Sequence, residues 1–484
     1  MIFIVLSKIS GLFRDTQFVS YFGINGYSDS YLVSFSIIIM IGSSFTEAIR
    51  SSLIEVVSKI ENNYENNRSI IIGFIKTYII IGALAITLLI VLFSRQLTNL
   101  WSINFSKESY SNAIHSLRIL AFIIPLMCGF AADSAVLNYN KKYGFTSSYQ
   151  FIINSILIIV LILFKKLSIY NYAIITLISY FLPNIISYLN YPNLARLNLS
   201  LKISNSYFKR FIKNFLPLLA ASFVYELNAV IDRSFASSLG EGTITILSLA
   251  GRINGIVYYM GTVVLSTVLY SNLLEKKAKS EEIFYKYSKH SIIILTVLVI
   301  PLSLFVIFMS KDIVSFLFIY RNINTEEITK IGSALTFYGI GLYFSIITEI
   351  YRRILYSYSD TKSSAKNSIY SVILNIILNS ILIKKYDFIG LALSTSIASI
   401  FLSILMVIEI RKKNKKLFDI QNIIITIFSL CATLISLIAS NYVLKSYTKF
   451  DNRIYLVIYF IIFILIYAII MFVINAISKN KYLT

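Results

Sequence analysis

The chain has 484 residues, of which 57% are hydrophobic and only 14% are charged. A soluble globular chain carries roughly 25% charged residues, so this composition excludes an ordinary water-soluble protein and indicates a membrane protein. The formal net charge is +21, but the basic residues gather in short segments between apolar runs. This is typical of loops that face the anionic inner leaflet, and nucleic-acid binding is not expected.

Apolar runs follow one another along the whole chain. A helix needs about 20 apolar residues to cross the hydrocarbon core, and hydropathy divides the chain into about fourteen such spans. No soluble domain intervenes, so the predicted fold class is an all-α polytopic membrane protein. The predicted spans centre near residues 12, 42, 82, 124, 156, 180, 224, 260, 298, 343, 374, 398, 430 and 465.

Basic residues are distributed unevenly between the two sets of loops. If the N-terminus is cytoplasmic, the inner loops hold Lys141–Lys142, the run 276–289 and the run 411–416, whereas Lys165–Lys166 and Lys384–Lys385 lie outside. The inner loops then carry about twice as many basic residues as the outer ones, and the positive-inside rule predicts that both termini are cytoplasmic.

Two parts of the chain resemble each other. The segment RDTQFVSYFG, residues 14–23, is similar to DRSFASSLG, residues 232–240, and 217 positions separate Asp15 from Asp232 as well as Gly23 from Gly240. Each half would hold six spans and point the same way through the membrane, as in transporters whose substrate site lies between two lobes. The predicted parts are a six-helix lobe over 1–205, a second over 206–416 and two additional helices over 417–484.

Charged residues interrupt several of the predicted spans. A charge inside the membrane costs roughly 2.5 kcal/mol or more, so such a residue faces a cavity or a partner. The first span, MIFIVLSKISGLFRDTQFVSYFG, carries Lys8, Arg14 and Asp15, and Ser7, Gly11 and Arg14 form one stripe along the helix. The other intramembrane charges are Asp29, Glu47, Arg50, Asp133, Glu226, Asp232, Arg233, Arg252, Glu349, Arg352 and Arg353.

The cations Lys8, Arg14 and Arg252 are the candidate binding groups. Fixed positive charges in a membrane cavity suit an anionic head group, above all a pyrophosphate, and arginine offers bidentate contacts. The competing interpretation is that these charges pair with acidic neighbours and only stabilise the helices.

Motifs for catalysis or metal binding are absent from the sequence. It contains no G-x-x-x-x-G-K-[ST] loop, no H-E-x-x-H and no G-x-S-x-G. Cys128 and Cys431 both lie in apolar runs, so we expect neither a disulfide nor a metal site. The sequence therefore predicts no catalytic residue and no metal ligand.

Several motifs in order resemble one family. The segment SKISGLFRD at 7–15 resembles S-R-x-x-G-x-x-R-D, the opening signature of the MviN/MurJ family of lipid II flippases. The resemblance implies a two-lobed fold of the multidrug/oligosaccharidyl-lipid/polysaccharide exporter type, with two extra spans that line a groove for the polyprenyl tail. Further matching segments are 231–253, 334–344, 352–366 and 387–398.

The resemblance assigns family positions to particular residues. Arg14, Asp29 and Arg252 match family-essential positions, Glu47 matches an acidic position, and Lys8 stands where the family has arginine. It implies that Asp15, Asp29 and Glu47 pair with the cations when the site is empty and hold the saccharide or a coupling ion.

The sequence also departs from the family pattern. Gly42 and Ser43 occupy the positions of a family Arg-Arg pair, and Arg50 lies about two turns further along the same helix. A lysine at position 8 keeps the positive charge but lacks the planar fork of arginine. With fewer fixed cations, a divergent member that carries a different polyprenyl-pyrophosphate glycan is an open alternative.

The expected function is a flippase, not an enzyme. It would carry a lipid-linked saccharide of the undecaprenyl-diphosphate type, above all lipid II, across the bacterial cytoplasmic membrane by alternating access. We expect no cofactor, coupling to the membrane potential or an ion gradient, and membrane lipids and cell-wall synthesis proteins as partners. The alternatives are a flippase for another wall, capsule or exopolysaccharide glycan, a cation-coupled drug exporter, a polytopic glycan-processing enzyme, or an inactive scaffold.

Overall fold

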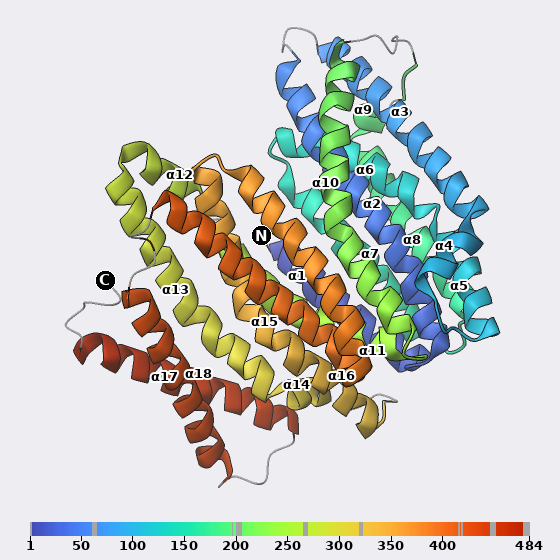
Figure 1. Ribbon diagram of the computed structural model, residues 1–484. Coiled ribbons are helices and arrows are strands. Elements are labelled where there is room, and N and C mark those ends of the chain that lie inside the picture. The colour runs from blue at the N-terminus through green and yellow to red at the C-terminus, as the bar shows by residue number, and fades with distance from the viewer. Residues whose placement is uncertain are drawn as a thin grey trace. The chain divides into compact units, whose positions relative to one another are not determined.

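The structure is a computed structural model that describes residues 2–60, 65–195, 197–199, 206–264, 270–318, 323–414, 417, 420–445 and 452–477. These residues form helices and the turns between them, with no β-strand among them, which confirms the all-α fold class (Figure 1). The chain divides into two compact units, Met1–Thr245 and Ile246–Thr484.

The first unit contains ten helices. They are α1 (Ile2–Phe22), α2 (Gly26–Lys59), α3 (Glu65–Leu92), α4 (Ser94–Trp101), α5 (Lys107–Leu120), α6 (Ile123–Tyr139), α7 (Tyr143–Leu163), α8 (Ile169–Asn190), α9 (Pro192–Ala195) and α10 (Ser206–Ser237).

The centre of the first unit is α2. This helix packs against α5, α6 and α10, while α1 packs against α7 and α8 joins α5, α6 and α7. Small and polar residues make these close contacts possible, because helices in lipid associate through close packing and interhelical hydrogen bonds. The hydroxyl of Tyr31 on α2, for example, pairs with that of Thr176 on α8 at 3.0 Å.

Glycines in the left-handed region end the two helices that the sequence predicts to be related. Gly23 follows α1 with φ +79° and Gly240 follows α10 with φ +118°, a conformation that costs glycine little. Asn25 then caps α2, because its side chain accepts from the amides of Tyr27 and Ser28. The repeated segments thus share a local structure as well as a sequence pattern.

The remaining helices lie mostly in the second unit, which the chain enters within α11, after Thr245. They are α11 (Thr243–Val264), α12 (Tyr270–Lys279), α13 (Glu281–Phe308), α14 (Ser310–Phe318), α15 (Thr325–Ser357), α16 (Thr361–Lys413), α17 (Ile420–Lys445) and α18 (Asn452–Ile477).

The element α16 is two helices joined at a sharp bend. Asp387 has φ +54° and ψ −142°, which are not helical values. The hydroxyl of Ser371, before the bend, donates to the carbonyl of Ala398 at 2.8 Å, so the two halves run back along each other. A Cβ on Gly390 would lie 2.5 Å from the carbonyl oxygen of Leu382, so only glycine allows this approach. The bend follows Lys384–Lys385, where the sequence predicts a loop.

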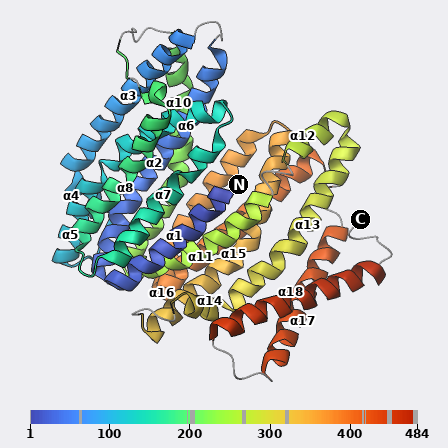
Figure 2. The same ribbon diagram turned by 180° about the vertical axis from the view of Figure 1, so that it is seen from behind.

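The last two helices pack against each other and against α13, and α18 also contacts α14 (Figure 2). The contact is aromatic and aliphatic, with Phe305 of α13, Leu437 of α17 and Tyr459 and Phe463 of α18 in one buried cluster. The Tyr459 hydroxyl donates to the Leu437 carbonyl at 2.8 Å, so the buried polar group is satisfied. Within the second unit, α17 and α18 therefore pack as a pair against α13.

Ten helical segments within the described residues are long and apolar enough to cross a membrane. Counting α16 as two, and adding the less apolar helices α1, α10 and α11, gives a number consistent with the fourteen predicted spans. The predicted part boundaries at residues 205 and 416, and Lys415–Lys416 of the last basic loop, lie outside the described residues. The division into six, six and two helices therefore stays a prediction.

Candidate functional site

Arg14 is a buried cation that contacts Asp15, Asn154 and Phe35 of the first unit. It lies in the middle of α1 and is 6% exposed. Its Nε and Nη2 donate to Oδ1 of Asp15 at 2.8 and 2.5 Å, and its Nη1 donates to Oδ1 of Asn154 on α7 at 3.0 Å. The guanidinium also lies 5.9 Å from the ring centroid of Phe35 on α2. This one side chain therefore connects α1 to α7 and reaches the surface of α2.

Asn154 organises the surroundings of Arg14. Its Nδ2 donates to the Ser7 carbonyl at 3.0 Å and to the Ser10 hydroxyl at 3.2 Å. Gly11 faces the same amide, since a Cβ on this glycine would lie 3.4 Å from it. The predicted stripe of Ser7, Gly11 and Arg14 is thus the surface on which α7 packs. The sequence does not single out Asn154 as a site residue, because a neutral amide in an apolar run is unremarkable in an asparagine-rich chain.

The other two predicted cations lie on different helices. Lys8 lies on α1, nearly two turns before Arg14, and is partly buried. Arg252 lies on α11 in the second unit and is also partly buried. Nearby in that unit, the Tyr258 hydroxyl of α11 donates to Glu349 of α15 at 3.2 Å, and Arg352 donates to the same carboxylate at 2.9 Å. The meeting of Lys8, Arg14 and Arg252 around one ligand stays a prediction.

Glu47 and Arg50 form a loose pair on α2. The Nη1 of Arg50 lies 3.9 Å from Oε2 of Glu47, and their side chains are 36% and 64% exposed, respectively. The Nε of Arg50 also donates to the Ser134 hydroxyl of α6 at 3.3 Å. Unlike Arg14, these charged groups are accessible at the surface of the first unit.

The departure from the family pattern at Gly42 and Ser43 has a packing consequence. A Cβ on Gly42 would lie 2.6 Å from the sulfur of Met127, so α2 and α6 approach closely here. The Ser43 hydroxyl is in turn a hydrogen-bond partner of Glu226 on α10. Gly42 and Ser43 thus place a small, uncharged pair where α2, α6 and α10 meet.

Asp29 is fully buried and binds the start of α11. Its Oδ2 accepts from the Gly242 amide at 2.7 Å, and its Oδ1 accepts from the amide and hydroxyl of Thr245 at 2.8 and 2.6 Å. A carboxylate is favourable at this place, because the first amides of a helix have no partner within the helix and carry partial positive charge. Asp29 therefore holds the segment through which the chain passes into its second unit.

Glu241, in the turn before α11, extends this connection. Its carboxylate accepts from the Ser109 hydroxyl at 2.7 Å and from the Ser106 amide at 3.1 Å. These bonds, with that from Ser109 the largest contribution, hold the pKa of Glu241 below its ordinary value. The turn 239–242 thus docks on the beginning of α5.

The structure contains a further buried ion pair, of which the sequence analysis named only the acidic member, Asp133. Lys76 of α3 donates to Oδ1 of Asp133 on α6 at 2.5 Å, and their side chains are 8% and 7% exposed. The other oxygen of Asp133 accepts from the Ser187 hydroxyl of α8 at 3.1 Å, and Lys76 also donates to the Leu194 carbonyl at 3.0 Å. Asp133 signals a partner because an isolated charge in a span is costly, but nothing in the sequence singles out Lys76.

The charged groups suit anion binding better than metal binding. Within the residues that the structure describes, no three His, Cys, Asp or Glu side chains gather closely enough to hold a metal ion. Arginine presents a planar fork of donors that matches phosphate oxygens. In the first unit that fork is occupied by Asp15 and Asn154, so an anion that binds Arg14 must displace the Asp15 carboxylate.

Sequence comparison finds relatives along most of the chain. A family model described as lipid II flippase MurJ matches residues 18–461. The probable lipid II flippase MurJ of Aquifex aeolicus is 25% identical over 395 residues, which are 80% of this chain and 76% of the relative. The lipid II flippase MurJ of Burkholderia cenocepacia is 22% identical over 430 residues, 85% of this chain and 82% of the relative.

Structure comparison finds the same fold. A lipid II flippase MurJ in an inward closed conformation matches with a TM-score of 0.84 and 24% identity, and covers 99% of each chain. An inward-facing multidrug resistance MATE family transporter of the MOP superfamily matches with a TM-score of 0.66 and 14% identity, over 85% of this chain and 95% of that one. The predicted exporter-type fold is thereby confirmed.

Proposed function

The chain belongs to the MurJ family of lipid II flippases, and on that premise we propose which of its charged groups handle the cargo. As a member it is a multi-pass membrane transporter of bacteria and not an enzyme. Its cargo is lipid II, a saccharide linked to a polyprenyl chain through a diphosphate, which it carries across the cytoplasmic membrane for peptidoglycan synthesis.

Arg14 is the proposed diphosphate ligand. The observation that supports this role is a buried guanidinium that donates two hydrogen bonds to the carboxylate of its own sequence neighbour, Asp15. A pair of adjacent residues does not fasten one helix to another, so it can open without unfolding the bundle. We propose that the diphosphate replaces Asp15 at the Nε and Nη2 of Arg14, while Asn154 keeps the side chain in place.

Lys8 and Arg252 complete the proposed cationic set, one from each unit. The diphosphate carries more negative charge than one arginine neutralises, and charge-assisted hydrogen bonds to several fixed cations hold it most strongly. Asp15, Glu47 and Asp29 are the proposed acidic partners, with Asp29 acting by holding the start of α11. Arg50, which is accessible and one turn from Glu47, supplies positive charge near the position of the missing Arg pair.

We propose that the two units rock about the cargo site and that the membrane potential or an ion gradient drives them, with no cofactor. The positive-inside distribution of lysine and arginine supports cytoplasmic positions for both termini. Membrane lipids surround the apolar helices, and cell-wall synthesis proteins are the proposed protein partners.

The test is rescue of a bacterium depleted of its own lipid II flippase. The wild-type chain should restore growth and precursor export, and Arg14→Ala and Arg252→Ala should each fail while reaching the membrane at normal levels. Removing the bidentate contact should slow transport about 100-fold, from the loss of two charge-assisted hydrogen bonds.

Arg210→Ala is the matched control, because Arg210 is half-exposed and pairs with Glu55 at the surface. It should rescue like the wild type. Full rescue by both Arg14→Ala and Arg252→Ala would refute the proposed site. If the wild-type protein inserts but does not rescue, the glycan that accumulates when this gene is deleted identifies the alternative cargo.

A further inference from the structure

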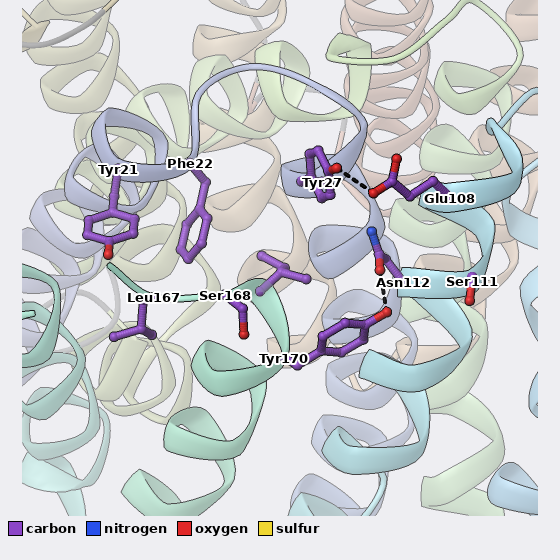
Figure 3. A pocket seen from close by; sticks show the side chains of 10 residues that line it. Tyr21, Phe22, Tyr27, Glu108, Ser111, Asn112, Leu167, Ser168 and Tyr170 are labelled. Atoms are coloured by element: carbon purple, nitrogen blue, oxygen red, sulfur yellow. Dashed lines mark hydrogen bonds between the residues drawn. The ribbon is translucent and has the colours of Figure 1, made fainter. Parts of the chain in front are cut away.

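A pocket of about 480 Å³ lies at one end of the first unit, among side chains that the proposed function does not use. It is formed where α1 ends and where α2, α5 and α8 begin (Figure 3). The topology predicted from the basic loops makes this the extracytoplasmic end. A pocket of this size is in the range of small-molecule sites.

Aromatic rings form much of the wall. Tyr21 and Phe22 come from the end of α1, Tyr27 from the start of α2 and Tyr170 from the start of α8. The rings of Tyr21 and Phe22 lie 4.8 Å apart between centroids, which fixes both. Tyrosine joins an apolar face to a polar tip, so such a wall contacts C–H groups and still offers hydroxyls.

Polar groups converge on the same space. The Tyr27 hydroxyl donates to Oε1 of Glu108 at 2.5 Å, and the Tyr170 hydroxyl donates to Oδ1 of Asn112 (Figure 3). Asn112 is only 4% exposed. The pocket thus has one carboxylate and one buried amide on the same helix, one turn apart.

Two buried polar atoms of the wall lack a hydrogen-bond partner. They are the Nδ2 of Asn112 and the hydroxyl oxygen of Tyr21. Buried polar atoms are almost always paired, and an unpaired one is unfavourable because it has lost its hydrogen bonds to water. The Nδ2 can only donate, so a partner that satisfies it must carry an acceptor.

The chemistry of these groups selects the ligand. An ammonium ion would suit the aromatic rings and Glu108, but it has no acceptor for Asn112. An anion would accept from Asn112, but Glu108 would repel it. A sugar hydroxyl accepts from Asn112 and donates to Glu108, while the ring face of the sugar packs on the tyrosines.

We propose that this pocket binds a neutral saccharide. The inference rests on the proposed function only for the source of the sugar, which is either the head group of the lipid-linked cargo after it has crossed or a free glycan. The diphosphate of the lipid-linked cargo is held elsewhere, because Glu108, the one charged side chain among the described residues that line the pocket, is acidic.

The experiment measures binding of N,N′-diacetylchitobiose, a neutral disaccharide, to the full chain in detergent by saturation-transfer NMR. Binding should be saturable, and Asn112→Leu and Glu108→Gln should each weaken it about tenfold, from the loss of a hydrogen bond to the sugar. Glu326→Gln is the matched control, since Glu326 is an exposed carboxylate early in α15 of the other unit, and it should bind like the wild type.

A second arm uses lipid II with the same variants. If the two substitutions weaken the binding of lipid II alone, the pocket takes the lipid-linked head group. If they weaken the binding of both ligands, the pocket also takes free sugar. The proposal is overturned if the substitutions at Asn112 and Glu108 change the binding of neither ligand. It is also overturned if tetramethylammonium saturates the pocket and the two saccharide ligands do not. Glu108 is exposed, so Glu108→Gln gives a folded variant even if Asn112→Leu does not. These are binding measurements, so they remain decisive even if the rescue test fails.

Discussion

Two ion pairs with little exposure, both among the described residues of the first unit, differ in the parts of the chain that they connect. Lys76–Asp133 joins α3 to α6 and, through Ser187 and the Leu194 carbonyl, to α8 and α9. Arg14–Asp15 joins two neighbours on α1. The first pair fastens helices that are far apart in sequence, whereas the Arg14–Asp15 pair lies within α1, and Arg14 reaches α7 through the neutral amide of Asn154. We conclude that the first is part of the scaffold and that the second is available for a change of partner.

The largest expected effect is on the scaffold pair. Asp133→Ala leaves the Lys76 ammonium buried without a carboxylate, and the free energy of unfolding should fall by about 3–5 kcal/mol. Unfolding of the purified protein monitored by circular dichroism measures this. The double variant Lys76→Met/Asp133→Leu should recover most of the loss, because a buried pair replaced by apolar groups is often neutral. If Asp133→Ala unfolds like the wild type, the Lys76–Asp133 pair does not stabilise the fold more than the Arg14–Asp15 pair does.

Asp29 should show a smaller effect, confined to the start of α11. Asp29→Ala leaves the amides of Gly242 and Thr245 without their acceptor, and the free energy of unfolding should fall by about 1–3 kcal/mol. Hydrogen–deuterium exchange over residues 240–250 should become faster in this variant. Ser30→Ala, which removes only a bond within α2, should leave exchange there unchanged. Unchanged exchange in Asp29→Ala would show that the carboxylate does not hold α11.

Arg14→Lys should separate stability from transport. It keeps the charge next to Asp15, so the free energy of unfolding should change by less than about 1 kcal/mol, whereas the lost fork should slow lipid II flipping about tenfold. A reconstituted flipping assay in liposomes, with the unfolding curve of the same sample, gives both quantities. Equal flipping by Arg14→Lys and wild type would mean that charge alone suffices.

The smallest effect concerns pH and the turn that docks on α5. Because the pKa of Glu241 is lowered in the folded protein, its contribution is present above the unfolded value of about 4.3 and is lost as the pH falls through the lowered value. Ser109→Ala removes the largest cause and should reduce the loss of stability between pH 6 and pH 3, by a few tenths of a kcal/mol for this exposed group. Unfolding midpoints across that range test it, and an identical pH dependence in Ser109→Ala would contradict the assignment.

The sequence predicts the helices and the charged groups better than it predicts the contacts between them. Spans follow from hydropathy alone, and Arg14, Asp15 and Asp133 are evident because charges in apolar runs are rare. Their partners, such as Asn154 and Lys76, are not evident from the sequence, because only the packing of helices brings them close. The partners of Asp29 could not be predicted for the same reason, because Gly242 and Thr245 lie more than 200 positions away in the sequence.

The pocket at the end of the first unit escaped sequence reasoning for a related reason. Its wall combines residues from four separate helix ends, and each of them alone resembles an ordinary loop residue. In a chain with 35 tyrosines and 35 phenylalanines, aromatic residues carry no signal until their positions in space are known.

The most direct test of the central claim compares Arg14→Ala with Asp133→Ala in one flipping assay and one unfolding experiment. The account predicts that Arg14→Ala loses lipid II transport while its unfolding free energy stays much closer to the wild type than that of Asp133→Ala. If Arg14→Ala flips lipid II at the wild-type rate, or if it unfolds as easily as Asp133→Ala, then Arg14 is a structural residue and the proposed diphosphate site is wrong.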